Sequence, residues 1–250
     1  MKKSALVIST VICLCFISCA KKQTRQPDAP DPVQQFFTAF ENDLTNTTKI
    51  IASNELIKNL THLQRMDFGG SRFYPLERDA LTKMIQSLSS YTYAECFLLN
   101  GTGTVIYTMF DDKMFSRNAE SFQNSLAILF RHCKEGEPYV MDVSDFPELA
   151  GSKRLYFGMP VKRGLNVEGV LIAALNAADV MKYAAIQEEA VDRNGIIRLS
   201  RRSEDLLTEN AAVKAAAENN PGNDLTAESA GQEYRYRLFS FRNIRWFIRQ

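Results

Sequence analysis

The feature that most constrains the fold is a series of short apolar segments between residues 93 and 176. An apolar run at 94–99 leads into an Asn-Gly-Thr-Gly segment, and a second run follows at 104–108. Two β-rich runs joined by a short Asn/Gly loop predict a β-hairpin. A helical stretch comes next, followed by three strand-like runs at 137–143, 154–162 and 167–175. This order predicts an α+β domain built on an antiparallel sheet.

The segment before the sheet has the apolar period of a helix. The stripe consists of Val33, Phe36, Phe37, Phe40, Leu44, Ile51, Leu56, Leu60 and Leu63. Asp31 and Pro32 are a suitable cap and first-turn residue, so we expect one long helix from there to about Met66. A second helix is expected over 76–88. The stripe predicts packing against the core, with the seam of a homodimer as the alternative.

The N-terminus carries an export signal. Lys2 and Lys3 precede an apolar stretch at 5–17 that is too short to span a bilayer comfortably. The stretch ends in Phe16-Ile17-Ser18-Cys19, which resembles the signal of bacterial lipoproteins. The resemblance implies cleavage before Cys19, a diacylglycerol on its sulfur and acylation of its new amino group. The alternative is an ordinary signal peptide or an uncleaved anchor.

This N-terminus predicts where the chain lies. We expect a signal peptide at 1–18 and a lipidated tether at 19–32, rich in Lys, Gln, Pro and Asp. The folded part would then lie outside the cytoplasm, anchored by lipid to the cell envelope and facing the periplasm or the exterior, with the outer membrane favoured. The membrane is therefore a partner only through the lipid.

The sheet region resembles the Cache domains of bacterial chemoreceptors and sensor kinases. The resemblance rests on the segments 97–108, 125–130, 143–146, 151–152, 157–161 and 168–171. The tail resembles the second lobe of double Cache modules, with a start at 191–197 and a final hairpin at 232–249 that turns near Arg242-Asn243. The Tyr, Arg, Trp-Tyr and Asp set with which some of these domains bind amino acids is not recognisable.

The resemblance implies an organisation and a kind of function. A helical region at 33–90 would precede a PAS-like lobe at 91–187 and a reduced, smaller PAS-like lobe at 188–250. In the family, the sheet and its overlying loops enclose a small-molecule pocket. Receptors of this type continue into a membrane helix, whereas this sequence stops at Gln250. We therefore expect a separate membrane receptor or transporter as the signalling partner.

Composition and motifs narrow the function further. Positive and negative charges nearly cancel, at a formal +1, which disfavours nucleic acid as a partner. The sequence has no GxSxG, P-loop or HExxH motif, and its two histidines form no metal-ligand pattern, so we expect no enzyme, metal or cofactor. The carboxylate pairs Asp111/Asp112 and Asp142/Asp145 are interpreted as solvated loop charges. Cys96 and Cys133 are consistent with either a disulfide or two buried thiols.

Candidate ligand-binding residues follow from strand alternation and from the resemblance. Along 154–159, alternate residues share a face, so Arg154, Tyr156 and Gly158 lie opposite Leu155, Phe157 and Met159. The candidates that border the pocket are Tyr107, Arg117, Tyr139, Asp145, Arg154, Tyr156 and Asn176. Arg117 or Arg154 would bind a carboxylate and Asp145 an amine. Half-buried tyrosines and surface arginines are the alternative interpretation.

The favoured function is a non-enzymatic, sensory lipoprotein that binds a small molecule whose identity the sequence leaves open. The alternative is a structural or assembly lipoprotein that keeps the fold without a ligand. A hydrolase or transferase has the least support.

Overall fold

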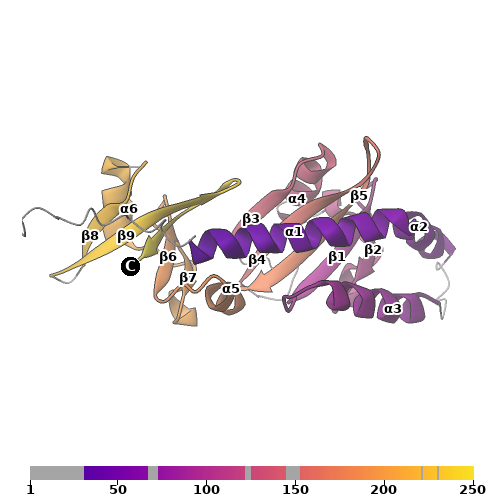
Figure 1. The fold of residues 1–250 in the computed structure, drawn as a ribbon, viewed down its shortest axis with the longest axis horizontal. Helices are drawn as coiled ribbons and strands as arrows, with labels where there is room; N and C mark the ends of the chain where they lie inside the picture. Colours follow the sequence, from indigo (N-terminus) through magenta and orange to yellow (C-terminus); the bar gives the residue numbers. More distant parts are fainter. Residues whose placement is uncertain (1–30, 67–72, 122–124, 145–152, 221, 230) are drawn as a thin grey trace, which may run out of the picture. The chain divides into compact units, whose positions relative to one another are not determined.

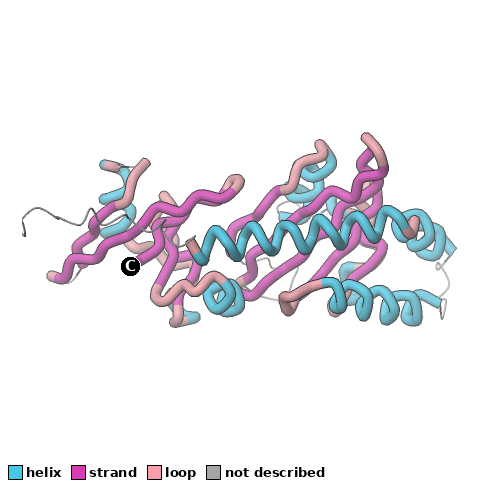
Figure 2. The backbone as a smooth tube through the Cα atoms, viewed as in Figure 1, coloured by secondary structure: helices cyan, strands magenta, loops and turns pink. Residues whose placement is uncertain are grey.

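The computed structural model describes residues 31–66, 73–121, 125–144, 153–220, 222–229 and 231–250. Residues 31–250 form one compact unit. Two five-stranded sheets follow one another in this unit, and every strand pair in them is antiparallel (Figures 1 and 2). The predicted α+β fold, with a long leading helix and two PAS-like lobes, is confirmed. The predicted signal peptide, Cys19 and the predicted tether up to residue 30 lie outside the described residues.

The leading helix is interrupted where the sequence predicted continuity. The three N-terminal helices are α1 (Pro32–Ser53), α2 (Leu56–Met66) and α3 (Phe73–Leu88). Asp31 caps α1 as expected, accepting a hydrogen bond from the Val33 backbone N–H at 3.1 Å. The helix ends because the Asn54 side chain donates to the Ile50 carbonyl at 2.8 Å and Glu55 adopts a left-handed φ of 53°. After this turn α2 contacts the first hairpin.

The first sheet confirms the predicted hairpin and the three later strands. Its strands are β1 (Glu95–Asn100), β2 (Val105–Thr108), β3 (Tyr139–Ser144), β4 (Arg154–Arg163) and β5 (Asn166–Asn176), in the spatial order β2-β1-β5-β4-β3. Short 3-10 turns at Asp112–Met114 and Ala119–Ser121 lead from β2 to α4 (Ser125–Lys134). The hairpin turn depends on Gly103, whose φ of 82° is unfavourable for other residues.

Helices cover both faces of the first sheet. Helix α1 packs on β4, and Phe37, Phe40 and Leu44 are fully buried there. The other face belongs to a second apolar cluster that includes Leu129 of α4 and Tyr156 of β4. Leu155, Phe157 and Met159 belong to the α1 cluster, so the predicted alternation along β4 is confirmed.

The two cysteines of the folded part are free, buried thiols. Cys96 belongs to the α1 cluster, whereas Cys133 of α4 belongs to the cluster on the opposite face of the sheet. The sheet itself separates them. This decides between the two interpretations that the sequence left open, against a disulfide.

The second lobe follows α5 (Ala177–Tyr183). It consists of β6 (Glu189–Asp192), β7 (Ile197–Ser200), a 3-10 turn (Ser203–Asp205), α6 (Ala211–Asn219), β8 (Leu225–Ser229), β9 (Gln232–Phe241) and β10 (Ile244–Arg249), with the spatial order β7-β6-β10-β9-β8. The final hairpin turns at Arg242, with a φ of 54°, as predicted. Strand β8 is not predicted by the sequence pattern, because only Leu225 and Ala227 are buried in it.

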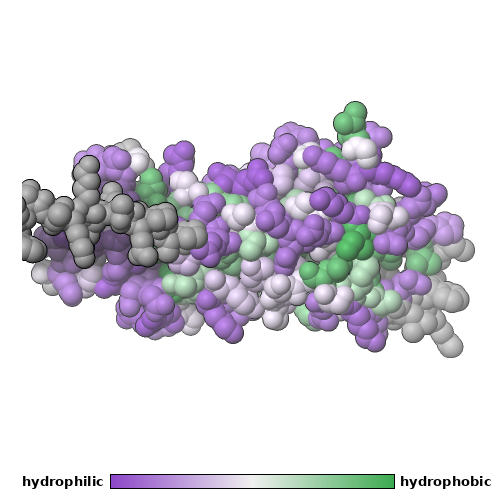
Figure 3. All heavy atoms as spheres, in the orientation of Figure 1, coloured by the Kyte–Doolittle hydropathy of each residue, from purple (hydrophilic) through white to green (hydrophobic). Residues whose placement is uncertain are grey.

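The exposed side of α1 is polar. The face in view in Figure 3 is mostly hydrophilic, and the apolar stripe of α1 is buried in the core. The stripe is therefore used for packing within the chain, and a homodimer stays a prediction. In the part of the chain that the structure describes, no helix combines the length and apolar character needed to cross a membrane.

Candidate functional site

The candidate site lies on the α4 face of the first sheet, at the end where β4 begins. Helix α4 closes the middle of this face: a Cβ added to Gly158 would lie 2.5 Å from the Cys133 Sγ. Toward the start of β4 the register brings polar side chains together. Arg154 pairs with Asn176 of β5 on one side and with Ser144 of β3 on the other. We call Ser144, Arg154 and Asn176 the polar row.

Arg154 is the distinctive member of the polar row. Its side chain is half-buried, and its Nε is buried without a hydrogen-bond partner among the described residues. Leaving a buried N–H unpaired is costly, so this donor is suited to an acceptor supplied from outside the chain. A carboxylate fits best, because a guanidinium binds it through two parallel hydrogen bonds.

The other candidate residues on this face of the sheet have defined contacts. Tyr156, two residues along β4 from Arg154, is fully buried in the α4-side cluster. Asn176 is exposed and is the last residue of β5, directly before α5, and its side-chain amide donates to the Asp179 carboxylate at 3.2 Å. Tyr139 pairs with Gly158 and therefore shares this face, with its ring stacked on His132 at a centroid separation of 4.1 Å. The structure thus brings Tyr139, Arg154, Tyr156 and Asn176 to one face of the sheet.

Two other candidates lie elsewhere. Tyr107 belongs to the α1-side cluster, fully buried, and its hydroxyl is 2.9 Å from the Thr82 hydroxyl of α3. Arg117 is exposed, and its carbonyl accepts from Val105 at the far end of the sheet. Val105 shares a row with Val170, six residues along β5 from Asn176, which is roughly 20 Å at the usual rise of a strand. Asp145 lies outside the described residues.

The Glu95 carboxylate accepts hydrogen bonds from the backbone of residues 109–111, which directly follow β2. Glu95 pairs with Ala174, which in turn pairs with Tyr156, so Glu95 lies two rows from Arg154 on the same face of the sheet. It is 2% exposed and accepts backbone N–H groups from Cys96, Met109, Phe110 and Asp111 at 2.8–3.0 Å. Burial raises the pKa of this carboxyl, and the four N–H donors oppose that effect. Sequence reasoning did not single out this residue.

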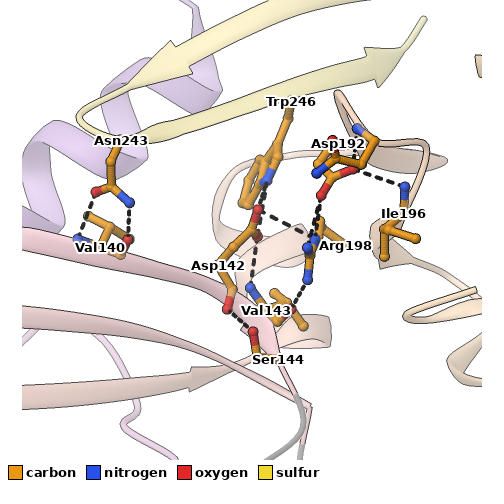
Figure 4. Close-up of polar contacts among 10 residues, drawn as sticks. Val140, Asp142, Val143, Ser144, Asp192, Ile196, Arg198, Asn243 and Trp246 are labelled. Carbon is orange, nitrogen blue, oxygen red and sulfur yellow. Dashed lines mark hydrogen bonds and ion pairs between the residues drawn. The ribbon is translucent and has the colours of Figure 1, made fainter. Parts of the chain in front are cut away.

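A second polar cluster joins the lobes, and sequence reasoning interpreted it wrongly. Asp142 of β3 is no solvated loop charge. Both of its carboxylate oxygens accept the indole N–H of Trp246 in β10, at 3.0 and 3.1 Å (Figure 4). Its Oδ2 also lies 3.6 Å from Nε of Arg198 in β7. Trp246 is the only tryptophan of the chain, which was the one sequence signal for this junction.

Further contacts complete the junction between the lobes. The Asn243 side chain donates to the Val140 carbonyl at 2.5 Å and accepts the Val140 N–H at 3.1 Å (Figure 4). The ring centroid of Phe37 in α1 lies 5.5 Å from that of Trp246 in the second lobe and 5.7 Å from that of Phe157 in the first. Phe37 therefore contacts both lobes. Burial raises the pKa of Asp142 to about 6, although Arg198 and Trp246 act in the opposite direction.

The described residues show no arrangement suited to a metal ion. No group of three or more His, Cys, Asp or Glu side chains among them is placed to hold one. What the polar row offers among the described residues is a buried guanidinium donor for an anionic group, beside a buried aromatic residue.

No protein-family model matches the sequence, and no curated protein matches it. The fold matches an extracellular ligand-binding receptor from Desulfohalobium retbaense, with a TM-score of 0.60 and 10% identity over 87% of this chain. The match covers 38% of that protein, so the chain spans well under half of its length.

Two further solved structures match over nearly their whole length. The sensor domain of the histidine kinase DctB from V. cholerae has a TM-score of 0.55 and 12% identity, over 88% of this chain and 95% of that one. The ligand-binding domain of the Pseudomonas fluorescens chemoreceptor CtaA, in complex with L-valine, has a TM-score of 0.54 and 12% identity, over 88% and 90%. The chain therefore shares the fold of these ligand-binding and sensor domains.

Proposed function

We propose that this chain is an extracytoplasmic sensory domain that binds a small molecule through the polar row of its first lobe. The observation that carries the proposal is the buried Arg154 Nε, for which the described residues provide no acceptor. The fold supports the same conclusion, because domains that share it are ligand-binding and sensor domains.

The ligand we propose carries a carboxylate. Arg154 would bind that group, Asn176 would contribute an amide at the adjacent strand end, and Tyr156 would form the floor beside them. The matched chemoreceptor domain binds L-valine, which has a carboxylate, but the rest of the ligand is left open here. Tyr139 would border the same site next to His132. Arg117 and Tyr107 are too far away or on the wrong face to contact the same small molecule.

We also propose that the chain is a lipoprotein. Cys19 would carry the lipid, and residues up to Pro30 would connect it to the compact unit that begins at Asp31. Two or more acyl chains on one residue are sufficient for stable anchoring. A state change on ligand binding would then reach the cytoplasm through a separate membrane receptor or transporter.

A ligand screen tests the binding proposal. The chain from Ala20 onward contains the whole compact unit, and its melting temperature would be measured with organic acids, amino acids, purines and polyamines. A ligand at a hundred times its Kd stabilises by about 2.7 kcal/mol, which corresponds to several degrees for a domain of this size. We expect a shift from at least one carboxylate compound. Shifts from none of them would favour the structural or assembly lipoprotein.

A labelling experiment tests the anchor separately. Full-length chain and its Cys19→Ala variant would be expressed in a bacterium fed with radiolabelled palmitate. We expect label in the parent chain and none in the variant, because the acylated groups are the sulfur and amino group of Cys19. Equal labelling of both would exclude Cys19 as the lipidated residue.

A further inference from the structure

At the junction between the lobes, two carboxylates share one guanidinium. Arg198 binds Asp192 with Nε at 3.1 Å and a terminal nitrogen at 2.8 Å, and the Asp142 carboxylate lies 3.6 Å from the same Nε (Figure 4). The other terminal nitrogen of Arg198 donates to the Val143 carbonyl at 2.7 Å. The three side chains therefore carry a net charge of −1 when both acids are ionised.

The two acids do not share Arg198 equally. Asp192 is 6% exposed and also accepts the backbone N–H groups of Asn194 and Ile196, at 2.8 and 3.0 Å. It therefore keeps its negative charge well compensated. Asp142 has the longer contact with Arg198 and depends on two neutral donors, the Trp246 indole and its neighbour Val143. A proton taken up at this site is accordingly expected on Asp142.

The charged groups that face Asp142 from the surrounding elements are few. Among the described residues, β7 presents Arg198 and β6 presents Asp192, while β10 presents the neutral indole of Trp246. The aromatic ring of Phe37 in α1 meets that indole in an edge-to-face contact. The ion pair of Arg242 with Glu41 joins α1 to the β9–β10 turn and is separate from this cluster.

We propose that Asp142 is a proton-operated latch between the lobes: proton uptake strengthens the docking of the second lobe on the first, and proton loss weakens it. Once Asp142 is neutral, Arg198 forms an ion pair with Asp192 alone. The carboxyl oxygen of Asp142 can still accept the indole N–H of Trp246. The remaining contacts, such as the Asn243–Val140 pair, keep the lobes joined in both states.

The direction follows from linkage. Burial raises the pKa of Asp142 to about 6 in the docked state, above its ordinary value of 3.8. The docked state therefore binds the proton more tightly than a state in which Asp142 is open to water. The stabilisation of the docked state by protonated Asp142 is fully present below the ordinary pKa of 3.8 and is lost as the pH rises through about 6. Mildly acidic conditions favour docking, and neutral conditions weaken it.

Trp246 gives a direct measurement because it is the only tryptophan. Its indole N–H gives a single resonance in a ¹H–¹⁵N spectrum of the chain from Ala20 onward, which can be followed from pH 4.5 to 8. We expect a titration with a midpoint near pH 6 that disappears in Asp142→Asn, a neutral isostere that still accepts the indole N–H. The variants His62→Gln and His132→Gln are controls that remove the two histidines of the chain one at a time, and both should keep the midpoint.

A distance measurement tests docking itself. Spin labels on Leu165→Cys in the β4–β5 turn and Glu233→Cys in β9 report on the two lobes, since the native thiols of the folded part are buried. We expect a narrower distance distribution at pH 5 than at pH 8 for the parent chain, and a narrow one at both for Asp142→Asn. Identical distributions at both pH values in the parent chain, a broader one at pH 5, or a midpoint that survives in Asp142→Asn, would overturn the proposal. If Asp142→Asn does not fold, the parent chain's indole titration and distance distributions decide alone.

Discussion

Asp31 and Arg237 join the start of α1 to the second lobe. The two oxygens of the Asp31 carboxylate accept hydrogen bonds from the two terminal nitrogens of Arg237 in β9, at 2.5 and 3.1 Å. One of these oxygens also caps the helix by accepting the Val33 N–H. A single carboxylate therefore fixes the first turn of α1 and ties that turn to a strand 206 residues away along the chain.

Removing the Asp31 carboxylate should destabilise the fold, and two variants can separate the contribution of the helix cap from that of the ion pair. Asp31→Ala is expected to lower the free energy of unfolding by about 1–3 kcal/mol, because both the cap and a partly exposed ion pair are lost. Asp31→Asn keeps a good cap and loses only the charge, so it should cost about 1 kcal/mol or less. Urea unfolding of both variants measures the difference. Equal losses in the two would mean that the cap contributes nothing.

Gly158 is where α4 approaches the sheet most closely. A methyl group there would overlap the Cys133 Sγ and lie 3.2 Å from Leu129, so Gly158→Ala should cost about 1–3 kcal/mol of unfolding free energy. Cys133→Ala removes the sulfur and should recover part of that loss in the double variant, a positive coupling in a double-mutant cycle. Gly222→Ala is the matched control, since nothing lies within 4 Å of its added Cβ. Additive losses would contradict the proposed overlap.

Much of the fold could be predicted because its signals are local. The Asn/Gly turn at 100–103, the alternation along β4 and the cap at Asp31 each depend on a few neighbouring residues. The break at Glu55 could not be predicted, because the apolar stripe continues across it into α2 and only a left-handed φ separates the helices. Strand β8 escaped because it buries only two side chains.

The site was predictable only in part, for the same reason. Alternation correctly placed Arg154 and Tyr156 on one face of β4. Alternation could not show that Tyr107 faces α3, because a register shift between β1 and β2 decides which side chains of β2 point toward α3. Asp142 gave no local signal of burial, since its partners Arg198 and Trp246 come from the second lobe.

Glu95 should be intolerant of even a conservative change. One of its oxygens accepts three backbone N–H groups and the other accepts that of Asp111 at 2.8 Å. In Glu95→Gln the amide nitrogen must face at least one of these donors, so a loss of about 1.5–3 kcal/mol is expected. Glu95→Ala leaves all four unpaired and should cost more. Chemical denaturation gives both values, and amide exchange at Asp111 should accelerate in each. A harmless Glu95→Gln would contradict the inference that both carboxylate oxygens are needed as acceptors.

Arg154 should matter for binding and hardly at all for folding. Because its buried Nε has no acceptor among the described residues, Arg154→Ala removes an unsatisfied donor, and the free energy of unfolding without ligand should change by about 1 kcal/mol or less. The thermal shift produced by any carboxylate ligand found in the screen should disappear. Arg154→Lys keeps the positive charge but cannot form two parallel hydrogen bonds to a carboxylate, so it should weaken binding rather than abolish it.

The matched control for Arg154 is Arg117→Ala, since Arg117 is exposed and lies in the row of Val105 at the other end of the sheet. This variant should keep the full ligand shift. A ligand response that survives Arg154→Ala but is lost in Arg117→Ala would move the site to the turn end of the sheet. An unfolding loss of several kcal/mol in Arg154→Ala without ligand would instead assign Arg154 a structural role.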